Sequence, residues 1–149
     1  MNSVPFVRGW LRWLALSVLL AAQLAGADQP AASGDAEEIV STIPMRVVAE
    51  EGEGVHGQLV VARELIDDQA GSDLVYTITV DPRFGRVGLA GGDAADFFRN
   101  KTARLGYFAY KPNLGYAGED AFTYTVRNEA SGLVFRNVVV IDVQPPAPV

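Results

Sequence analysis

The sequence predicts an all-β domain built as a sandwich of about seven short strands. Several segments alternate apolar and polar residues with a period of two, and no segment sustains a helical period over three turns. Clusters of Gly, Pro, Asn and Asp separate these segments. Short strands divided at regular intervals by turn residues are typical of a β-sandwich.

The strands are expected in seven places along the chain. The third is the clearest, because Leu74, Tyr76, Ile78 and Val80 alternate with polar or smaller residues and should share one face. The expected ranges are 45–48, 58–61, 74–80, 86–89, 107–110, 122–126 and 133–143.

Residues 91–100 interrupt this pattern. We expect one helical turn there, with Asp93 as its N-terminal cap. Phe97 or Phe98 should plug one end of the sandwich, although an exposed binding loop is the alternative. Residues 100–102 match the N-glycosylation pattern, which we interpret as a chance match.

The N-terminus predicts export. Residues 1–27 combine Arg8 and Arg12, an apolar run over 13–22 and small residues at Ala25 and Ala27, the three parts of a cleavable signal peptide. An uncleaved anchor is the alternative, but the run is shorter than the roughly 20 residues that cross a membrane. We therefore expect a secreted or periplasmic protein, with no transmembrane anchor after cleavage.

The rest of the chain divides into three parts. Residues 28–41 are expected to be a flexible acidic leader, 42–144 the sandwich and 145–149 a proline-rich tail. All 18 acids but only 10 of the 12 Lys and Arg follow residue 27, so the mature chain carries a formal charge of −8. This acidity disfavours nucleic-acid binding.

The composition also disfavours catalysis. The chain has no cysteine, which removes thiol nucleophiles and thiolate metal sites. Its one histidine, His56, lies among glycines and is expected to be exposed, and no Gly-x-Ser-x-Gly elbow is present. We predict that the protein is not an enzyme.

Four segments together resemble a known repeat. They are Leu-x-Tyr at 74–76, Gly-x-Val-x-Leu at 85–89, Phe-Ala-Tyr-Lys-Pro at 108–112 and the block from 115 to 126, which contains Gly-Glu-Asp-Ala-Phe-Thr-Tyr-Thr-Val. Over about residues 50–143 the chain is similar to one bacterial cadherin-like or Ig-like repeat, of the kind found in tandem in adhesins and biofilm surface proteins. The resemblance implies an Ig-like Greek-key sandwich, extracellular placement, no catalysis and often calcium at repeat junctions.

The block at 118–126 also has a structural interpretation of its own. Phe122, Tyr124 and Val126 should enter the core from one strand face. The spacing of Asp120 and Tyr124 matches the tyrosine corner of Ig domains, with Val126 in place of the second cysteine. We expect Asp120 to pair with an arginine such as Arg86 or Arg104, calcium ligation being the alternative.

The resemblance also suggests where calcium would bind. Its early Glu turn corresponds to Glu51, and its Asp-x-Asp turn to Asp67 and Asp68, with Asp73 nearby. The second acid of Asp-x-Asp is Gln69, and prolines replace the acidic junction to a following repeat. A hard cation needs six to eight oxygens, so we expect at most a weak calcium site and no required cofactor.

Two functional hypotheses follow. The first is a non-catalytic module for protein association, self-association or adhesion at the bacterial surface or in the periplasm. The alternative is a soluble carbohydrate-binding or periplasmic accessory protein that uses five aromatic residues, Phe97, Phe98, Tyr107, Tyr110 and Tyr116. The β-prone segment 39–43 should either protect the edge of its own domain or pair with a neighbour.

Overall fold

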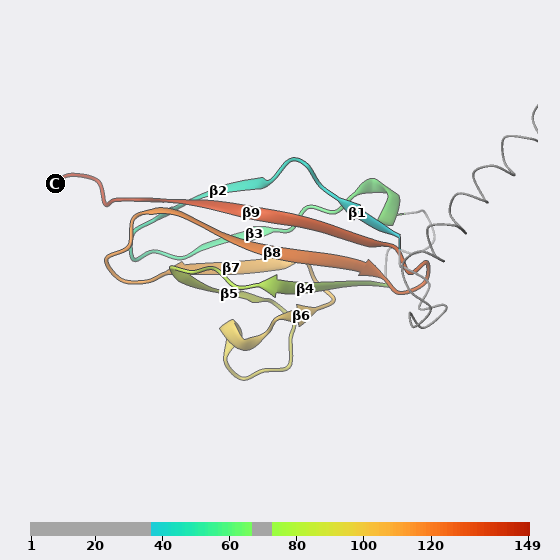
Figure 1. The fold of residues 1–149 in the computed structure, drawn as a ribbon. Helices are drawn as coiled ribbons and strands as arrows, with labels where there is room; N and C mark the ends of the chain where they lie inside the picture. The colour runs from blue at the N-terminus through green and yellow to red at the C-terminus, as the bar shows by residue number, and fades with distance from the viewer. Residues whose placement is uncertain (1–36, 67–72) are drawn as a thin grey trace, which may run out of the picture. The chain divides into compact units, whose positions relative to one another are not determined.

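A computed structural model describes residues 37–66 and 73–149. The expected signal peptide, most of the expected leader, and Asp67 and Asp68 lie outside these ranges. Within them, nine strands form two sheets packed as a sandwich (Figure 1). The strands are β1 (Glu38–Val40), β2 (Met45–Glu50), β3 (Val55–Gln58), β4 (Leu74–Val80), β5 (Gly85–Leu89), β6 (Thr102–Ala103), β7 (Tyr107–Pro112), β8 (Gly118–Asn128) and β9 (Val134–Gln144).

One sheet has six strands and the other has three. The six-stranded sheet has the order β1-β9-β8-β4-β6, with β2 also paired to β9, and the three-stranded sheet has the order β3-β7-β5. The long hairpin of β8 and β9 dominates the larger sheet, with Phe122 opposite Val139 and Thr125 opposite Arg136. The orders β9-β8-β4 and β3-β7-β5 are the Greek-key arrangement of an Ig-like sandwich, G-F-C over B-E-D.

The core lies between the two sheets and follows the predicted alternation. Phe122, Tyr124 and Val126 of β8 are fully buried, as the period of two predicted. Phe108 of β7 packs edge-on against Phe122 across the sandwich, with 5.4 Å between ring centroids. Burying each such side chain stabilises the fold by roughly 1.5–3 kcal/mol.

The prediction for the third strand is wrong at its last residue. Leu74, Tyr76 and Ile78 are buried as expected, but Val80 is 56% exposed. The pairing with β8 shifts between Ile78 and Val80, which inserts Thr79 as an extra residue. Because successive side chains alternate between faces, one extra residue moves Val80 to the opposite face.

The expected strand at 58–61 is also displaced. Strand β3 ends at Gln58, and the apolar residues after it form a loop. The Leu59 N–H donates to the Gly106 carbonyl, and a 3₁₀ turn over Arg63–Leu65 follows. Leu59 and Leu65 are both buried, so this apolar run fills the core without entering the sheet.

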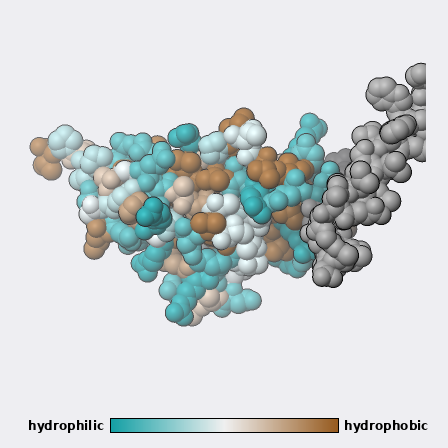
Figure 2. Space-filling view, in the orientation of Figure 1, coloured by the Kyte–Doolittle hydropathy of each residue, from teal (hydrophilic) through white to brown (hydrophobic). Residues whose placement is uncertain are grey.

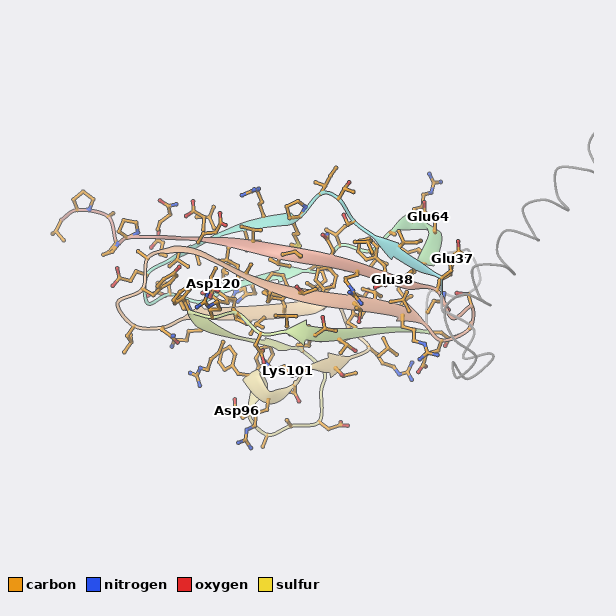
Figure 3. The ribbon with its side chains drawn as sticks, viewed as in Figure 1. Glu37, Glu38, Glu64, Asp96, Lys101 and Asp120 are labelled. Carbon is orange, nitrogen blue, oxygen red and sulfur yellow. The ribbon has the colours of Figure 1, made fainter. Side chains whose placement is uncertain are left out.

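The loop between β5 and β6 joins the edges of the two sheets. The Asn100 carbonyl accepts from Leu89 N–H of the three-stranded sheet, and the next carbonyl, of Lys101, accepts from Ile78 N–H of the six-stranded sheet. Figure 3 shows Lys101 on this loop. The loop therefore closes one side of the sandwich and covers two strand edges that would otherwise expose backbone groups.

The details of this loop correct two predictions. The 3₁₀ turn Phe97–Arg99 is capped by Asp96, whose carboxylate accepts from Phe98 N–H at 3.0 Å, and not by Asp93. Phe97 and Phe98 are half-buried and lie over β5, so neither plugs an end. The backbone of Phe97 approaches Gly88 so closely that a Cβ at position 88 would clash with the Phe97 carbonyl oxygen.

Strands β1 and β2 both run parallel to β9, along different parts of it. Residues 38–40, placed in the expected leader, pair with Val134, Phe135 and Arg136, and an ion pair of 2.7 Å joins Glu38 to Arg136. Residues 45–50 pair with Val139–Gln144. The structure thus places part of segment 39–43 on the edge of its own domain.

Candidate functional site

Asp120 is a buried carboxylate at one end of the sandwich, opposite the end that carries Glu37 and Glu38 (Figure 3). Its side chain is fixed by four hydrogen bonds. Oδ1 accepts from the N–H groups of Arg83 and Ala121, both at 2.9 Å. Oδ2 accepts from Phe84 N–H at 3.0 Å and from the Tyr110 hydroxyl at 2.8 Å.

These contacts overturn the predicted arginine partner. The guanidinium of Arg86 lies over the Phe98 ring, 4.8 Å from its centroid, and Arg104 pairs with Glu129 at 2.9 Å. The turn between β4 and β5 instead points backbone N–H groups at Asp120. Such donors satisfy a buried carboxylate without ordering a long side chain. Asp120 therefore has a structural role that ties β8, β7 and this turn together.

Burial raises the pKa of Tyr110, and its hydrogen bond to Asp120 raises the pKa further. The Tyr110 side chain is fully buried, so its ionised form would lose hydration beside an existing carboxylate. Tyr110 consequently serves as a hydrogen-bond donor in the core.

Tyr124 is also fully buried, but it does not form the predicted tyrosine corner. Its hydroxyl donates to the Val60 carbonyl at 2.7 Å, 64 residues earlier in the chain. In a tyrosine corner, the hydroxyl binds backbone only a few residues upstream. Here it anchors the loop after β3 to the core, and burial raises the pKa of Tyr124 to about 12.

The four residues proposed for calcium do not form one described site. Glu51 follows β2 beside the end of β9, where its N–H donates to Gln144. The Asp73 carbonyl accepts from Glu129 N–H, just past the far end of β8. The ten residue steps of β8 separate these positions by about 33 Å, so Glu51 and Asp73 cannot share an ion.

Within residues 37–66 and 73–149, no three acidic or histidine side chains are grouped so that they could hold a metal ion. Asp67 and Asp68 fall between these ranges. Calcium binding through Asp67 and Asp68 with Asp73 remains a prediction.

The five aromatic residues proposed for carbohydrate binding are dispersed. Tyr110 is in the core, and Tyr107 is about half exposed near the start of β7. Phe97 and Phe98 form an edge-to-face pair over β5, with centroids 5.5 Å apart. The fifth ring, Tyr116, stacks on Phe84, with 4.3 Å between the ring centroids. The structure presents no row of these rings.

The structure also places two other residues that were singled out from the sequence, His56 and Asn100. His56 is exposed on β3, as predicted. Asn100, in the glycosylation pattern, is buried, and its side chain bonds both the N–H and the carbonyl of Ala94. A glycan could not be attached there without opening this loop.

The outer face of the six-stranded sheet is the surface that sequence reasoning missed. We define the outer face by the outward side chains of β4, β8 and β9. Its middle is uncharged and half-buried, with Ala121, Thr123 and Thr125 on β8 beside Val138 and Val140 on β9. Thr77 of β4 lies opposite Thr125. The signal was present in the sequence, because these outward positions carry Val and Thr where solvated strands more often carry charge.

Charged residues lie at the two ends of the outer face. Glu119 of β8 is paired in register with Asp142 of β9 at one end. Arg127 of β8 lies at the other end. Arg136 of β9 is opposite Thr125, which is the outward residue next to Arg127 on β8. All four side chains are exposed. Figure 2 shows hydrophobic and hydrophilic residues interspersed over the visible side of the domain.

The sandwich and its strand order define the protein as an Ig-like domain. A family model for the bacterial Ig domain matches residues 27–141, and the chain belongs to this family. Domains of this family are generally not enzymes, and they are often extracellular or at the cell surface. No curated protein matches the chain.

Solved structures give only distant similarities. An endo-fucoidan hydrolase of glycoside hydrolase family 107 matches at 14% identity and a TM-score of 0.41, over 69% of this chain and 13% of the enzyme. PapD-like domain 7 of human CEP192 matches at 11% identity and a TM-score of 0.35, over 70% of this chain and 84% of that domain. The chain thus spans about an eighth of the hydrolase, and neither likeness is informative about activity.

In the described part of the chain, no helix is long and apolar enough to cross a membrane.

Proposed function

We propose that this protein is an exported, non-catalytic module that works by protein–protein association at the bacterial surface or in the periplasm. The observation that carries the proposal is the outer face of the six-stranded sheet. It combines an uncharged middle with a charged rim, which is the anatomy of a protein interface. Family membership and the expected signal peptide support the placement outside the cytoplasm.

The carbohydrate-binding alternative has less support. A sugar is bound by aromatic rings presented together on one surface with polar groups beside them. The proposed rings are dispersed, and two of them, Tyr110 and Tyr116, are occupied by contacts with Asp120 and Phe84. The outer face of the six-stranded sheet therefore fits a protein partner better than a sugar.

Photo-cross-linking in cells tests the association. A photoreactive amino acid is placed at Thr123, in the middle of the outer face, or at His56, on the opposite sheet, as the matched control. We expect cross-linked protein products from Thr123 and none from His56, with the chain in the periplasmic or extracellular fraction. Absence of products from Thr123, or retention of the chain in the cytoplasm, would contradict the proposal.

We further propose weak calcium binding through Asp67 and Asp68 with Asp73. Extracellular modules bind calcium with dissociation constants of roughly 10⁻⁴–10⁻³ M, so saturating calcium should raise the melting temperature by a few degrees. Thermal melts in chelator, millimolar calcium and millimolar magnesium measure this. Identical melts in all three would exclude the site, and Asp67→Asn should abolish any shift that is specific to calcium.

A further inference from the structure

We infer that the outer face of β4, β8 and β9 is a self-complementary interface whose partner is a second copy of this chain. The inference rests on the proposed function and names its partner. It follows from the order of charge along the two central strands. On β8 the outward residues run from Glu119 through uncharged side chains to Arg127. On β9, Asp142 lies at the same end as Glu119, and Arg136 lies towards the end that carries Arg127.

This order of charge, acidic at one end of the face and basic at the other, suits two-fold symmetry. A two-fold axis that lies in the interface and crosses the strands at Thr123 would reverse the strand direction of the second copy. The acidic end of each copy would then face the basic end of the other, with Glu119 opposite the partner's Arg127. The same patch would serve both copies, as in an isologous dimer. The rotation places the uncharged middle of one face against the same residues of the other.

The charges at the two ends of β8 are free to make such pairs. In residues 37–66 and 73–149, Glu119 and Arg127 are exposed and neither forms an ion pair. Arg136 is held by Glu38, and Asp142 accepts from the Gln144 amide. Glu119 and Arg127 are therefore the residues that should decide the orientation of the second copy.

The size of the face predicts a weak dimer. Three adjacent strands about 4.8 Å apart, each with about eight residues at about 3.4 Å, give a face of roughly 400 Å² per copy. Two copies would bury about 800 Å², below the size of stable specific interfaces and in the range of weak, transient ones. The association should be visible at high protein concentration and sensitive to single charges.

The test is sedimentation velocity of the purified protein, expressed from the full-length chain, up to about 500 µM. The net charge of −8 opposes self-association, so the buffer contains about 0.15 M salt, which screens charges beyond about 8 Å. We expect a reversible dimer. Glu119→Lys or Arg127→Glu alone should each raise the dissociation constant at least tenfold, because each places like charges opposite one another.

Two combinations make the test specific. An equal mixture of the Glu119→Lys and Arg127→Glu proteins should form the heterodimer, since every facing pair is again of opposite sign. The double variant should dimerise with itself for the same reason. This recovery also shows that the single variants are folded. Matched charge changes at Glu53 (Glu53→Lys) and Lys111 (Lys111→Glu), both exposed and away from the face, should leave the dimer unchanged.

A wild-type protein that stays monomeric up to 500 µM would overturn the inference, as would single variants that dimerise normally or a mixture that does not recover. The cross-linked products from Thr123 distinguish a failure of self-association from a failure of the proposed association with any protein. Products of twice the chain's mass support a second copy. A product with a different protein would retain the association function but refute self-recognition, and no product at all would refute both.

Discussion

At the scale of single residues, the decisive feature is the buried carboxylate of Asp120. Its two oxygens accept four hydrogen bonds from three elements of the fold. The structure extends the expected strand back to Gly118, which places Asp120 on the same buried face as Phe122 and Tyr124. Its partners could not be predicted, because three are backbone N–H groups that any residue supplies and the fourth is Tyr110, which the sequence suggested only as a candidate sugar-binding ring.

Replacing this carboxylate should destabilise the fold strongly. Asp120→Asn retains the shape but replaces one acceptor oxygen by an N–H donor, which leaves two of the four groups that donate to Asp120 without an acceptor. We expect a loss of about 2–4 kcal/mol in the free energy of unfolding, at about 1–3 kcal/mol per buried group. Urea denaturation measures it, with the exposed Asp93→Asn as control, expected within about 0.5 kcal/mol of wild type. Equal midpoints for both variants would refute the role of Asp120.

The buried tyrosines predict a loss of stability at alkaline pH. Burial raises the pKa of Tyr124 to about 12 and also raises that of Tyr110. The unfolded chain releases these protons near pH 10, before the folded chain does. Stability is therefore fully present below pH 10 and falls as pH rises towards 12, by about 1.4 kcal/mol per pH unit for each tyrosine.

Urea midpoints between pH 8 and 11.5 check this dependence. Tyr124→Phe removes one buried hydroxyl and should flatten the slope above pH 10, while lowering stability at pH 8 through loss of the bond to Val60. Tyr107→Phe, at an exposed tyrosine, is the control and should keep the wild-type slope. A slope unchanged by Tyr124→Phe would contradict the prediction.

At the scale of elements, the edges of the sheets were the hardest part to predict. The alternating pattern identified the central strands, and β4 matches its expected range of 74–80. It did not reveal β6, because a strand of two residues is too short to show a period. For β1, the β-prone composition of 39–43 indicated strand pairing but left open whether the partner was its own domain or a neighbour. Strands β1 and β6 form where the edges of β9 and β4 have backbone N–H and carbonyl groups to pair with.

Strand β1 should contribute to stability by covering the edge of β9. Deletion of residues 28–42 removes this strand and leaves the backbone groups around Val134 and Arg136 without partners. We expect a lower urea midpoint and greater aggregation, because an uncovered edge pairs with other chains. Deletion of 28–36 alone, which keeps β1, is the control and should behave as wild type. Equal stability of the two deletions would mean that β1 is dispensable.

At the scale of the whole molecule, the sequence predicts a mature protein that begins at or near Asp28. Both tryptophans of the chain, Trp10 and Trp13, lie in the expected signal peptide. The exported protein should therefore show no tryptophan fluorescence, and its intact mass should correspond to residues 28–149. A mass that retains Trp10 and Trp13 would refute cleavage, and tryptophan emission from the unfolded protein would refute it independently.

The alternating pattern was sufficient to predict the class of fold and the inward face of its main strands. Alternation is a local property, because each step along a strand reverses the side-chain direction, so Phe122, Tyr124 and Val126 could be assigned to the core without knowing their neighbours. The same reasoning failed at Val80, where a single extra residue reversed the alternation.

Contacts between residues far apart in the chain could not be predicted from this pattern. The bond from Tyr124 to Val60 spans 64 residues, and that from Arg83 to Asp120 spans 37. The outer face likewise exists only once β8 and β9 lie side by side in a register that aligns Glu119 with Asp142. Such contacts depend on strand order and register, which are set by the packing of the entire core and leave little trace in the local sequence.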